Sequence, residues 1–281
     1  SRVSTVDTTS ADQPRTTPLQ LLRRIVTAPA VGPFIALLLT MAFFAVKSDR
    51  FLQAQNLSLV LQQVMVVGVL AIGETFVILT AGIDLSCGTV MAFGQIVMTK
   101  LAVASGVPPL QALLLGILAC VGFGMLNGGL VTGLRLPAFI VTLGTLNIAF
   151  ALTHIVSNDL TFSPLPSELL FFGRTFTLAG ADVTYGVVMM LGLYALAWFG
   201  LSQTAWGRHV YAVGDNPEAA RLTGINTNRV LFSVYALAGL TYGIAALLLV
   251  GRTGLGDPNA GQTTENLDAI TAVVLGGTSL F

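Results

Sequence analysis

The composition of this 281-residue chain excludes most classes of soluble protein. Only 9% of its residues are charged and 54% are hydrophobic, and the mean hydropathy is +0.83. Because an ordinary soluble domain is about 25% charged, we exclude a soluble enzyme, a disordered protein and a nucleic-acid binder with a basic face. The composition predicts an all-α fold, a polytopic bundle of transmembrane helices. The net charge of zero says nothing about partners.

Two polar or amphipathic segments precede the first long apolar segment. Residues 1–18 are polar and rich in Ser, Thr and Asp, which predicts a disordered tail. Residues 19–27, LQLLRRIVT, place two arginines beside leucines, which suits a short helix on the membrane surface. A secretory signal peptide would have a shorter polar lead and a small-x-small cleavage site, so we expect the first hydrophobic segment to remain as an anchor.

Residues 28–281 form the predicted transmembrane domain. A helix needs about 20 apolar residues to cross the roughly 30 Å hydrocarbon core. Seven segments fit this requirement: Ala28–Val46, Leu57–Thr80, Gly88–Ala104, Leu110–Leu134, Ala138–Ser157, Val183–Leu201 and Val230–Val250. An eighth begins at Ala269, but the 13 residues up to Phe281 are too few to cross, so we expect further spans to follow.

The distribution of basic residues predicts the orientation of the bundle. A cytoplasmic N-terminus places eight arginines inside: Arg2, Arg15, Arg23, Arg24, Arg135, Arg208, Arg221 and Arg229. It places five basic residues outside: Lys47, Arg50, Lys100, Arg174 and Arg252. The loop over residues 202–229 is basic and the loop over residues 158–182 is acidic, as inside and outside loops should be.

Carboxyl groups lie in and just after the second span, in the stretch AIGETFVILTAGIDLS. Glu74 lies well within that span, where a carboxylate costs a few kcal/mol and should face the bundle interior or a water-filled path. It is either a structural group bonded to a neighbouring helix or part of a pathway. Asp84 and Ser86 follow a glycine-containing break, and we expect either residue to cap the next helix. Such a break is tolerated only against protein or a cavity.

Polar side chains also occur within the fifth span, PAFIVTLGTLNIAFALTH. Thr142, Thr145 and Asn147 supply the hydroxyl and amide groups that a polyhydroxylated solute needs when it leaves water. Together with Glu74 and Asp84 they form the predicted translocation path. Each of them alone is equally typical of helix-to-helix packing in a membrane.

Small residues in the fourth span predict close helix packing. Gly124 and Gly128, and then Gly129 and Gly133, give two consecutive GxxxG spacings.

Cysteine and histidine give no sign of metal or redox chemistry. Cys87 and Cys120 lie in apolar surroundings and are interpreted as small core residues. His154 and His209 are far apart and lack ligand spacing, so no metal site is predicted. We find no GxSxG, HExxH or paired catalytic carboxylate motif and predict no catalytic residues.

The most informative stretch is the loop over residues 202–229, which predicts a short helix outside the membrane. Asp215 or Asn216 caps it, Pro217 fits its first position and Gly224 ends it. Good helix formers occupy the positions between: Glu218, Ala219, Ala220, Arg221 and Leu222. Two turns are too short to be stable alone. We expect this helix to dock either against a separate protein or against the spans of its own chain.

These residues carry a resemblance to a known family. Glu218-Ala219-Ala220 followed by Gly224 resembles the EAA…G cytoplasmic loop of ABC importer permeases. The surrounding GRHVYAVGDNPEAARLTGI is similar to the form in the ribose/xylose/fructose class. Three other stretches resemble the same class: VILTAGIDLSCGTVMAFG, PAFIVTLGTLNI and NLDAITAVVLGGTSLF. Members of that class carry about ten spans, which implies that two or three more follow here.

The resemblance implies a mechanism and a set of partners. Two permease subunits, expected to be a homodimer in the bacterial inner membrane, would form the path for a monosaccharide. A cytoplasmic ABC ATPase would bind ATP and Mg²⁺ and grip the coupling loop: Gly214, Asn216, Pro217, Glu218, Ala219, Ala220 and Gly224. Gly214 and Gly224 would absorb backbone change as the loop moves the adjoining spans. A binding protein outside the cell would deliver the sugar.

The sequence itself indicates that any ATP chemistry lies in another chain. Neither Lys47 nor Lys100 is preceded by the glycine-rich spacing of a P-loop. No cofactor and no nucleic acid are predicted for this chain.

The outer segment over residues 251–271 is rich in Gly, Asn and Thr. It either meets the binding protein, lines the outer mouth of the path, or serves as a connecting loop. Asn266 or Thr264 is expected to cap the helix that follows.

Three other functions compete with this one. An ion-coupled secondary transporter would use Glu74 and Asp84 as proton or cation sites. An intramembrane enzyme would need Glu74 or His154 with partners that the sequence does not supply. A structural membrane scaffold is opposed by the polar residues inside the spans.

Overall fold

The computed structural model describes residues 31–178, 180–261 and 264–278. The predicted tail over residues 1–18 and interfacial helix over residues 19–27 lie outside these ranges. The described residues form helices α2–α11, one 3₁₀ turn and one β-hairpin, in the order α2 Val31–Lys47, α3 Ala54–Ile78, α4 Cys87–Val103, α5 Pro109–Gly133, α6 Ala138–Ser157, η1 Phe171–Gly173, β1 Thr175–Leu178, β2 Ala181–Thr184, α7 Tyr185–Gln203, α8 Ala205–Asp215, α9 Pro217–Leu222, α10 Thr227–Thr253 and α11 Thr264–Leu275.

The predicted helical membrane fold is confirmed. In the described part of the chain, α3, α5, α6, α7 and α10 are long and apolar enough to cross a membrane, while α2 and α4 are shorter apolar helices. The predicted span Ala138–Ser157 has the bounds of α6, and the others begin or end within a few residues of the observed helices. The length of each apolar run locates these helices, because a helix that crosses the hydrocarbon core needs about 20 predominantly apolar residues.

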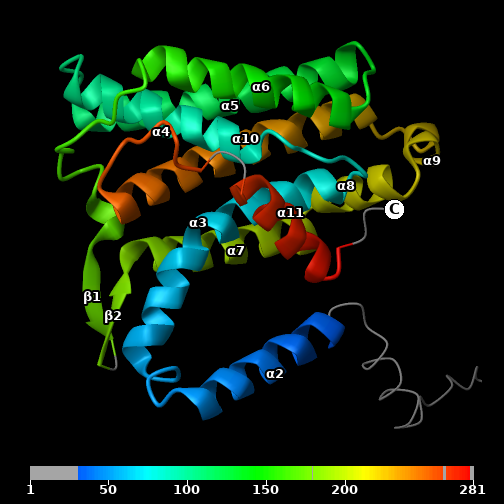
Figure 1. Ribbon diagram of the computed structural model, residues 1–281. Coiled ribbons are helices and arrows are strands. Elements are labelled where there is room, and N and C mark those ends of the chain that lie inside the picture. The colour runs from blue at the N-terminus through cyan, green and yellow to red at the C-terminus, as the bar shows by residue number, and fades with distance from the viewer. Residues whose placement is uncertain (1–30, 179, 262–263, 279–281) are drawn as a thin grey trace, which may run out of the picture.

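The core lies along α10, which packs against α3, α4 and α5. It is the most buried of the long helices, whereas α7 and α6 expose most of their apolar side chains. Figure 1 shows α5 and α6 side by side, with α3 and α7 beyond α10 and α2 set apart from the bundle. The exposed leucines and phenylalanines of the outer helices form the surface that lipid or another membrane subunit would cover.

Glycines allow α5 and α10 to pack closely against each other. A side chain on Gly124 would overlap the Tyr235 carbonyl oxygen of α10, and one on Gly128 would meet Phe232 and Tyr235. This contact confirms the packing role of the first predicted GxxxG pair. The predicted packing role is wrong for the second pair, because a side chain on Gly129 or Gly133 would have no neighbouring atom within 4 Å.

The two ends of the bundle carry different structures. The β1–β2 hairpin, paired from Thr175 opposite Thr184 to Leu178 opposite Ala181, lies at one end, and α9 lies at the other (Figure 1). The sequence analysis missed this hairpin and treated residues 158–182 as a loop. It also began the next span at Val183, which pairs with Phe176 in the hairpin instead, so α7 starts at Tyr185.

The segment after α10 returns into the bundle. Gly256 pairs with Phe162, and the Gln95 side-chain amide then donates hydrogen bonds to the carbonyl oxygens of Asp257 (2.7 Å) and Ala260 (3.1 Å). Gly261 then lies beside Met91. The segment therefore follows α4 toward its N-terminus, and α11 begins at Thr264, earlier than the predicted start of the eighth span at Ala269.

Candidate functional site

The break between α3 and α4 is built by a tight, non-helical turn. Ala81 adopts φ +58°, a left-handed conformation that side chains other than glycine rarely adopt. The backbone N–H groups of Thr80 and Gly82 both donate to the Val77 carbonyl, which closes the end of α3. The Thr142 hydroxyl on α6 donates to the Ile83 carbonyl at 3.1 Å. The backbone polar groups of the break are thus satisfied by protein, as non-helical structure inside a membrane requires.

A tyrosine hydroxyl lies between the two predicted carboxyl groups. Tyr242 Oη on α10 is 3.0 Å from Glu74 Oε1 and 3.1 Å from Asp84 Oδ2. All three side chains are almost completely buried. The structure therefore brings together Glu74 on α3 and Asp84 in the break, and it joins both to α10.

Asp84 binds the start of the next helix in an unexpected way. Its Oδ1 accepts hydrogen bonds from the Ser86 N–H at 2.8 Å and from the Ser86 hydroxyl at 2.6 Å. The Asn127 amide on α5 donates to the same hydroxyl at 3.1 Å. Ser86 is the N-cap residue of α4, but its side chain makes no capping bond. The predicted capping is wrong for Ser86, whose hydroxyl bonds to Asp84 and to Asn127 on α5. Asp84 does accept a backbone N–H at the start of α4, but from the N-cap residue Ser86 and not from the first turn.

The cap of α4 comes from a distant part of the chain. Asn266 Oδ1 on α11 accepts from the backbone N–H of Gly88 and from the Cys87 thiol at 3.3 Å. Gly88 has no room for a side chain, because a Cβ there would overlap Asn266 and the Gly261 carbonyl. Asn266, one of the two residues predicted to cap the helix that follows the outer segment, therefore caps α4, and its bond joins α11 to the start of α4.

Several buried polar atoms near the break have no hydrogen-bond partner. Among the described residues these atoms are Glu74 Oε2, Asn127 Oδ1 and Tyr235 Oη, together with Gln95 Oε1 beside the returning segment. A side chain on Gly82 would contact the Tyr235 hydroxyl, which places this group at the break as well. Unsatisfied groups of this kind are costly and mark a site with a further role.

The remaining residues of the predicted path are dispersed. Thr145 is buried, but its hydroxyl donates within α6, to the carbonyls of Val141 and Thr142. Asn147 is exposed on the outer face of α6, and its amide donates to the Leu143 carbonyl at 2.8 Å. Of the three predicted path residues on α6, Thr142 is the one whose side chain donates a hydrogen bond to the break.

The loop over residues 202–229 forms two helices, α8 and α9, where one was predicted. Of the two predicted caps, Asn216 is the one used, since its Oδ1 accepts from the Ala219 N–H at 2.9 Å. Pro217 occupies the first turn, and Gly224 follows the helix with φ +89°. The sequence analysis missed α8 because only Thr204 separates it from α7, so no loop between the two helices can be recognised.

The exposed face of α9 has both charged and apolar groups. Glu218 and Arg221 form an exposed ion pair at 2.6 Å, which raises the pKa of Arg221 above its ordinary value because the carboxylate accepts a hydrogen bond from it. Leu222 is 79% exposed, and Ala219 is exposed beside it, whereas Ala220 is buried. Of the two predicted alanines, Ala219 alone is available to a partner.

Gly214 connects this loop to the break. A side chain on Gly214, near the end of α8, would overlap the carbonyl oxygen of Leu79 and approach Thr80. The glycine therefore lets α8 pack directly on the chain between Glu74 and Asp84. A displacement of α8 would press on the break without any intervening side chain.

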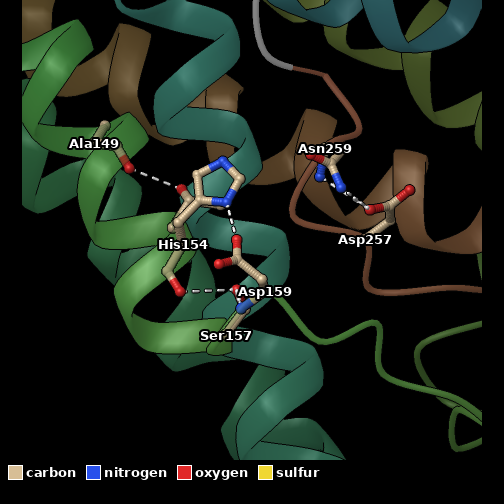
Figure 2. Close-up of polar contacts among 7 residues, drawn as sticks. Ala149, His154, Ser157, Asp159, Asp257 and Asn259 are labelled. Carbon is tan, nitrogen blue, oxygen red and sulfur yellow. Dashed lines mark hydrogen bonds and ion pairs between the residues drawn. The ribbon is translucent and has the colours of Figure 1, made fainter.

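At the hairpin end, polar pairs fix the chain where α6 ends. Figure 2 shows the His154 ring pointing toward the Asp159 carboxylate, and Asp257 beside Asn259 in the returning segment. The Asn259 N–H donates to Asp257 Oδ1 at 2.9 Å, which forms a local turn. No group of three or more His, Cys, Asp or Glu that could hold a metal occurs in the part of the chain that the structure describes.

Comparisons with known proteins agree with the architecture. A family model described as "Branched-chain amino acid transport system / permease component" matches residues 56–281. The chain is 43% identical to the fructose import permease protein FrcC of Rhizobium meliloti, over 99% of this chain and 79% of that protein. It is 37% identical to the ribose import permease protein RbsC of Bacillus subtilis, over 89% of this chain and 77% of that protein. It is also 32% identical to the xylose transport system permease protein XylH of Haemophilus influenzae, over 88% of this chain and 81% of that protein. No solved structure matches the chain.

The chain belongs to the permease family of ABC import systems. This finding confirms the resemblance seen in the coupling loop and favours an importer subunit over an ion-coupled transporter or an enzyme. The permease is a multi-pass inner-membrane protein. Its site residues that the sequence analysis missed are Tyr235, Tyr242 and Asn127. Tyr242 lies seven positions after Tyr235 in an apolar helix, and only the packing of α10 against the break reveals either one.

Proposed function

We propose that this chain is the membrane-spanning subunit of an ATP-driven importer of a monosaccharide of the ribose, fructose or xylose kind. The proposal draws its substrate class from the relatives named above. The observation that carries the energy coupling is the exposed α9 with its Asn216 cap, packed through α8 against the break. A separate ATPase, which would bind ATP and Mg²⁺, would supply the energy.

In this proposal α9 is the docking element. Its exposed surface presents Ala219, Leu222 and the Glu218–Arg221 pair to the ATPase. When the ATPase closes on ATP, α9 and α8 would move as a unit, and the contact between Gly214 and Leu79 would transmit that motion to the break. Gly224 has the backbone freedom to absorb the change on the other side of α9.

The sugar would pass near the break, where Glu74, Asp84 and Thr142 lie. Oxygen and nitrogen atoms there can replace the hydrogen bonds that sugar hydroxyls lose on leaving water. Glu74 and Asp84 have no exposed surface, so this conformation is closed at that point. We propose that Thr145 and Asn147 on α6 belong to the same path in the assembled importer, in which a second copy of the chain forms the other half.

The proposed orientation places α9 and the N-terminus in the cytoplasm and the hairpin outside. Arg208, Arg221 and Arg229 at the α9 end then follow the positive-inside rule. A sugar-binding protein would dock at the hairpin end.

Transport assays test this function. Membrane vesicles that carry the full-length protein with its native partners should take up a radiolabelled monosaccharide, and unlabelled ribose, fructose or xylose should compete. Uptake should stop when ATP is removed and persist when an uncoupler collapses the proton gradient. Uptake that survives without ATP and stops with the uncoupler would contradict the proposal.

A further inference from the structure

The carboxyl pair at the break lies in a setting without positive charge. Glu74 and Asp84 are fully buried, and neither forms an ion pair in the ranges that the structure describes. The titratable groups around them are Cys87 on α4 and Tyr235 and Tyr242 on α10, which supply no cation. Two ionised carboxylates so close together in a membrane interior would repel each other without compensation.

The hydrogen-bond geometry requires one proton in addition to the hydroxyl hydrogen of Tyr242. A tyrosine hydroxyl has one hydrogen to donate and lone pairs that accept. Tyr242 Oη lies within hydrogen-bond distance of an oxygen from each carboxyl, at 3.0 and 3.1 Å. It can donate in only one of these contacts, so the other is a bond only if a carboxylic O–H donates to the tyrosine.

The remaining contacts decide which carboxyl holds that proton. Asp84 Oδ1 already accepts two hydrogen bonds from Ser86, which favour an ionised acceptor. Glu74 Oε2 accepts no hydrogen bond of ordinary length and angle, although the Cys87 thiol and the Asp84 backbone N–H lie near this carboxyl. Leaving an anionic oxygen unpaired costs more than leaving a neutral carbonyl oxygen unpaired. The neutral form therefore belongs on Glu74.

We propose that Glu74, Tyr242 and Asp84 form a clamp that holds one proton, carried by Glu74, and that the clamp fastens the α3–α4 break to α10. Glu74 Oε1–H donates to Tyr242 Oη, and the tyrosine O–H donates to the ionised Asp84 Oδ2. Tyr242 is a positioning residue in this arrangement. The proposal stands on these contacts and does not depend on which solute is transported.

Infrared spectroscopy of the full-length protein in lipid tests the position of the proton. A protonated carboxyl gives a C=O stretching band separate from those of ionised carboxylates. Wild-type protein at neutral pH should show this band, Glu74→Gln should lose it, and Asp84→Asn should keep it. Tyr242→Phe should keep the band at a shifted frequency, because Glu74 loses its acceptor. Glu168→Gln, at an exposed carboxyl, is the matched control and should leave the protonated-carboxyl band unchanged.

Transport rates provide a second, independent readout. Glutamine has nearly the shape of a neutral glutamic acid and can donate to Tyr242, so Glu74→Gln should lower uptake much less than Asp84→Asn does. Asp84→Asn, which removes the charged acceptor of three hydrogen bonds, should lower uptake by roughly tenfold or more.

Two results would overturn the proposal. A wild-type spectrum without the band would mean that both carboxyls are ionised, and this measurement needs no variant to fold. A band that disappears in Asp84→Asn and persists in Glu74→Gln would place the proton on the wrong residue.

Discussion

Leu222 is the side chain on which ATPase docking should depend most. It is 79% exposed at the end of α9, next to the exposed Ala219. Burying a leucine side chain on docking is worth about 1.5–3 kcal/mol. Leu222→Ala should therefore weaken ATPase binding by roughly 10- to 100-fold. Because the side chain is exposed in the permease alone, the stability of the permease should change by less than about 0.5 kcal/mol.

Binding of the partner ATPase to the permease in lipid nanodiscs measures this effect. Leu160→Ala is the matched control, since Leu160 is 60% exposed at the opposite end of the bundle. The control should bind the ATPase with wild-type affinity. If Leu222→Ala binds as tightly as the control, the exposed face of α9 is not the docking surface and the reasoning is refuted.

Three further substitutions test the contacts around this element and in the core. Asn216→Ala removes the cap of α9 and should cost about 1 kcal/mol of local stability, seen as faster hydrogen exchange at the Ala219 amide; unchanged exchange would mean that the cap contributes nothing. Gly214→Ala should push α8 away from the Leu79 carbonyl and lower the amount of sugar taken up per ATP hydrolysed; an unchanged ratio would remove this contact from the coupling route. Gly124→Ala should destabilise the permease by about 1–3 kcal/mol in thermal unfolding, whereas Gly129→Ala, which has open space around it, should not; equal effects would contradict the packing described for α5 and α10.

The helices and the coupling loop could be predicted because their signals are local. An apolar run such as Ala138–Ser157 specifies a membrane helix by itself, and Asn216-Pro217 followed by Gly224 specifies the start and end of α9. The position of Glu74 within an apolar run predicted that its side chain faces the interior of the bundle, and it is fully buried there. Each of these inferences needs only residues within a few turns of one another.

The partners of those residues depend on tertiary contacts, which one sequence does not reveal. Tyr242 meets Glu74 from 168 positions away, and Asn266 caps α4 from 178 positions beyond Gly88. The segment after α10 has the composition of an ordinary loop, and its return along α4 depends on the buried amide of Gln95. The hairpin was missed because its four-residue strands are too short to show clear alternation.

Purification of the full-length permease from its native membranes in mild detergent, with every associated chain identified, tests the central claim most directly. The account predicts that an ATPase with a P-loop co-purifies with the wild-type protein and is lost from Ala219→Glu, while that variant still inserts into the membrane. An ATPase that remains bound to Ala219→Glu, or wild-type permease that transports sugar with no ATPase attached, would contradict it.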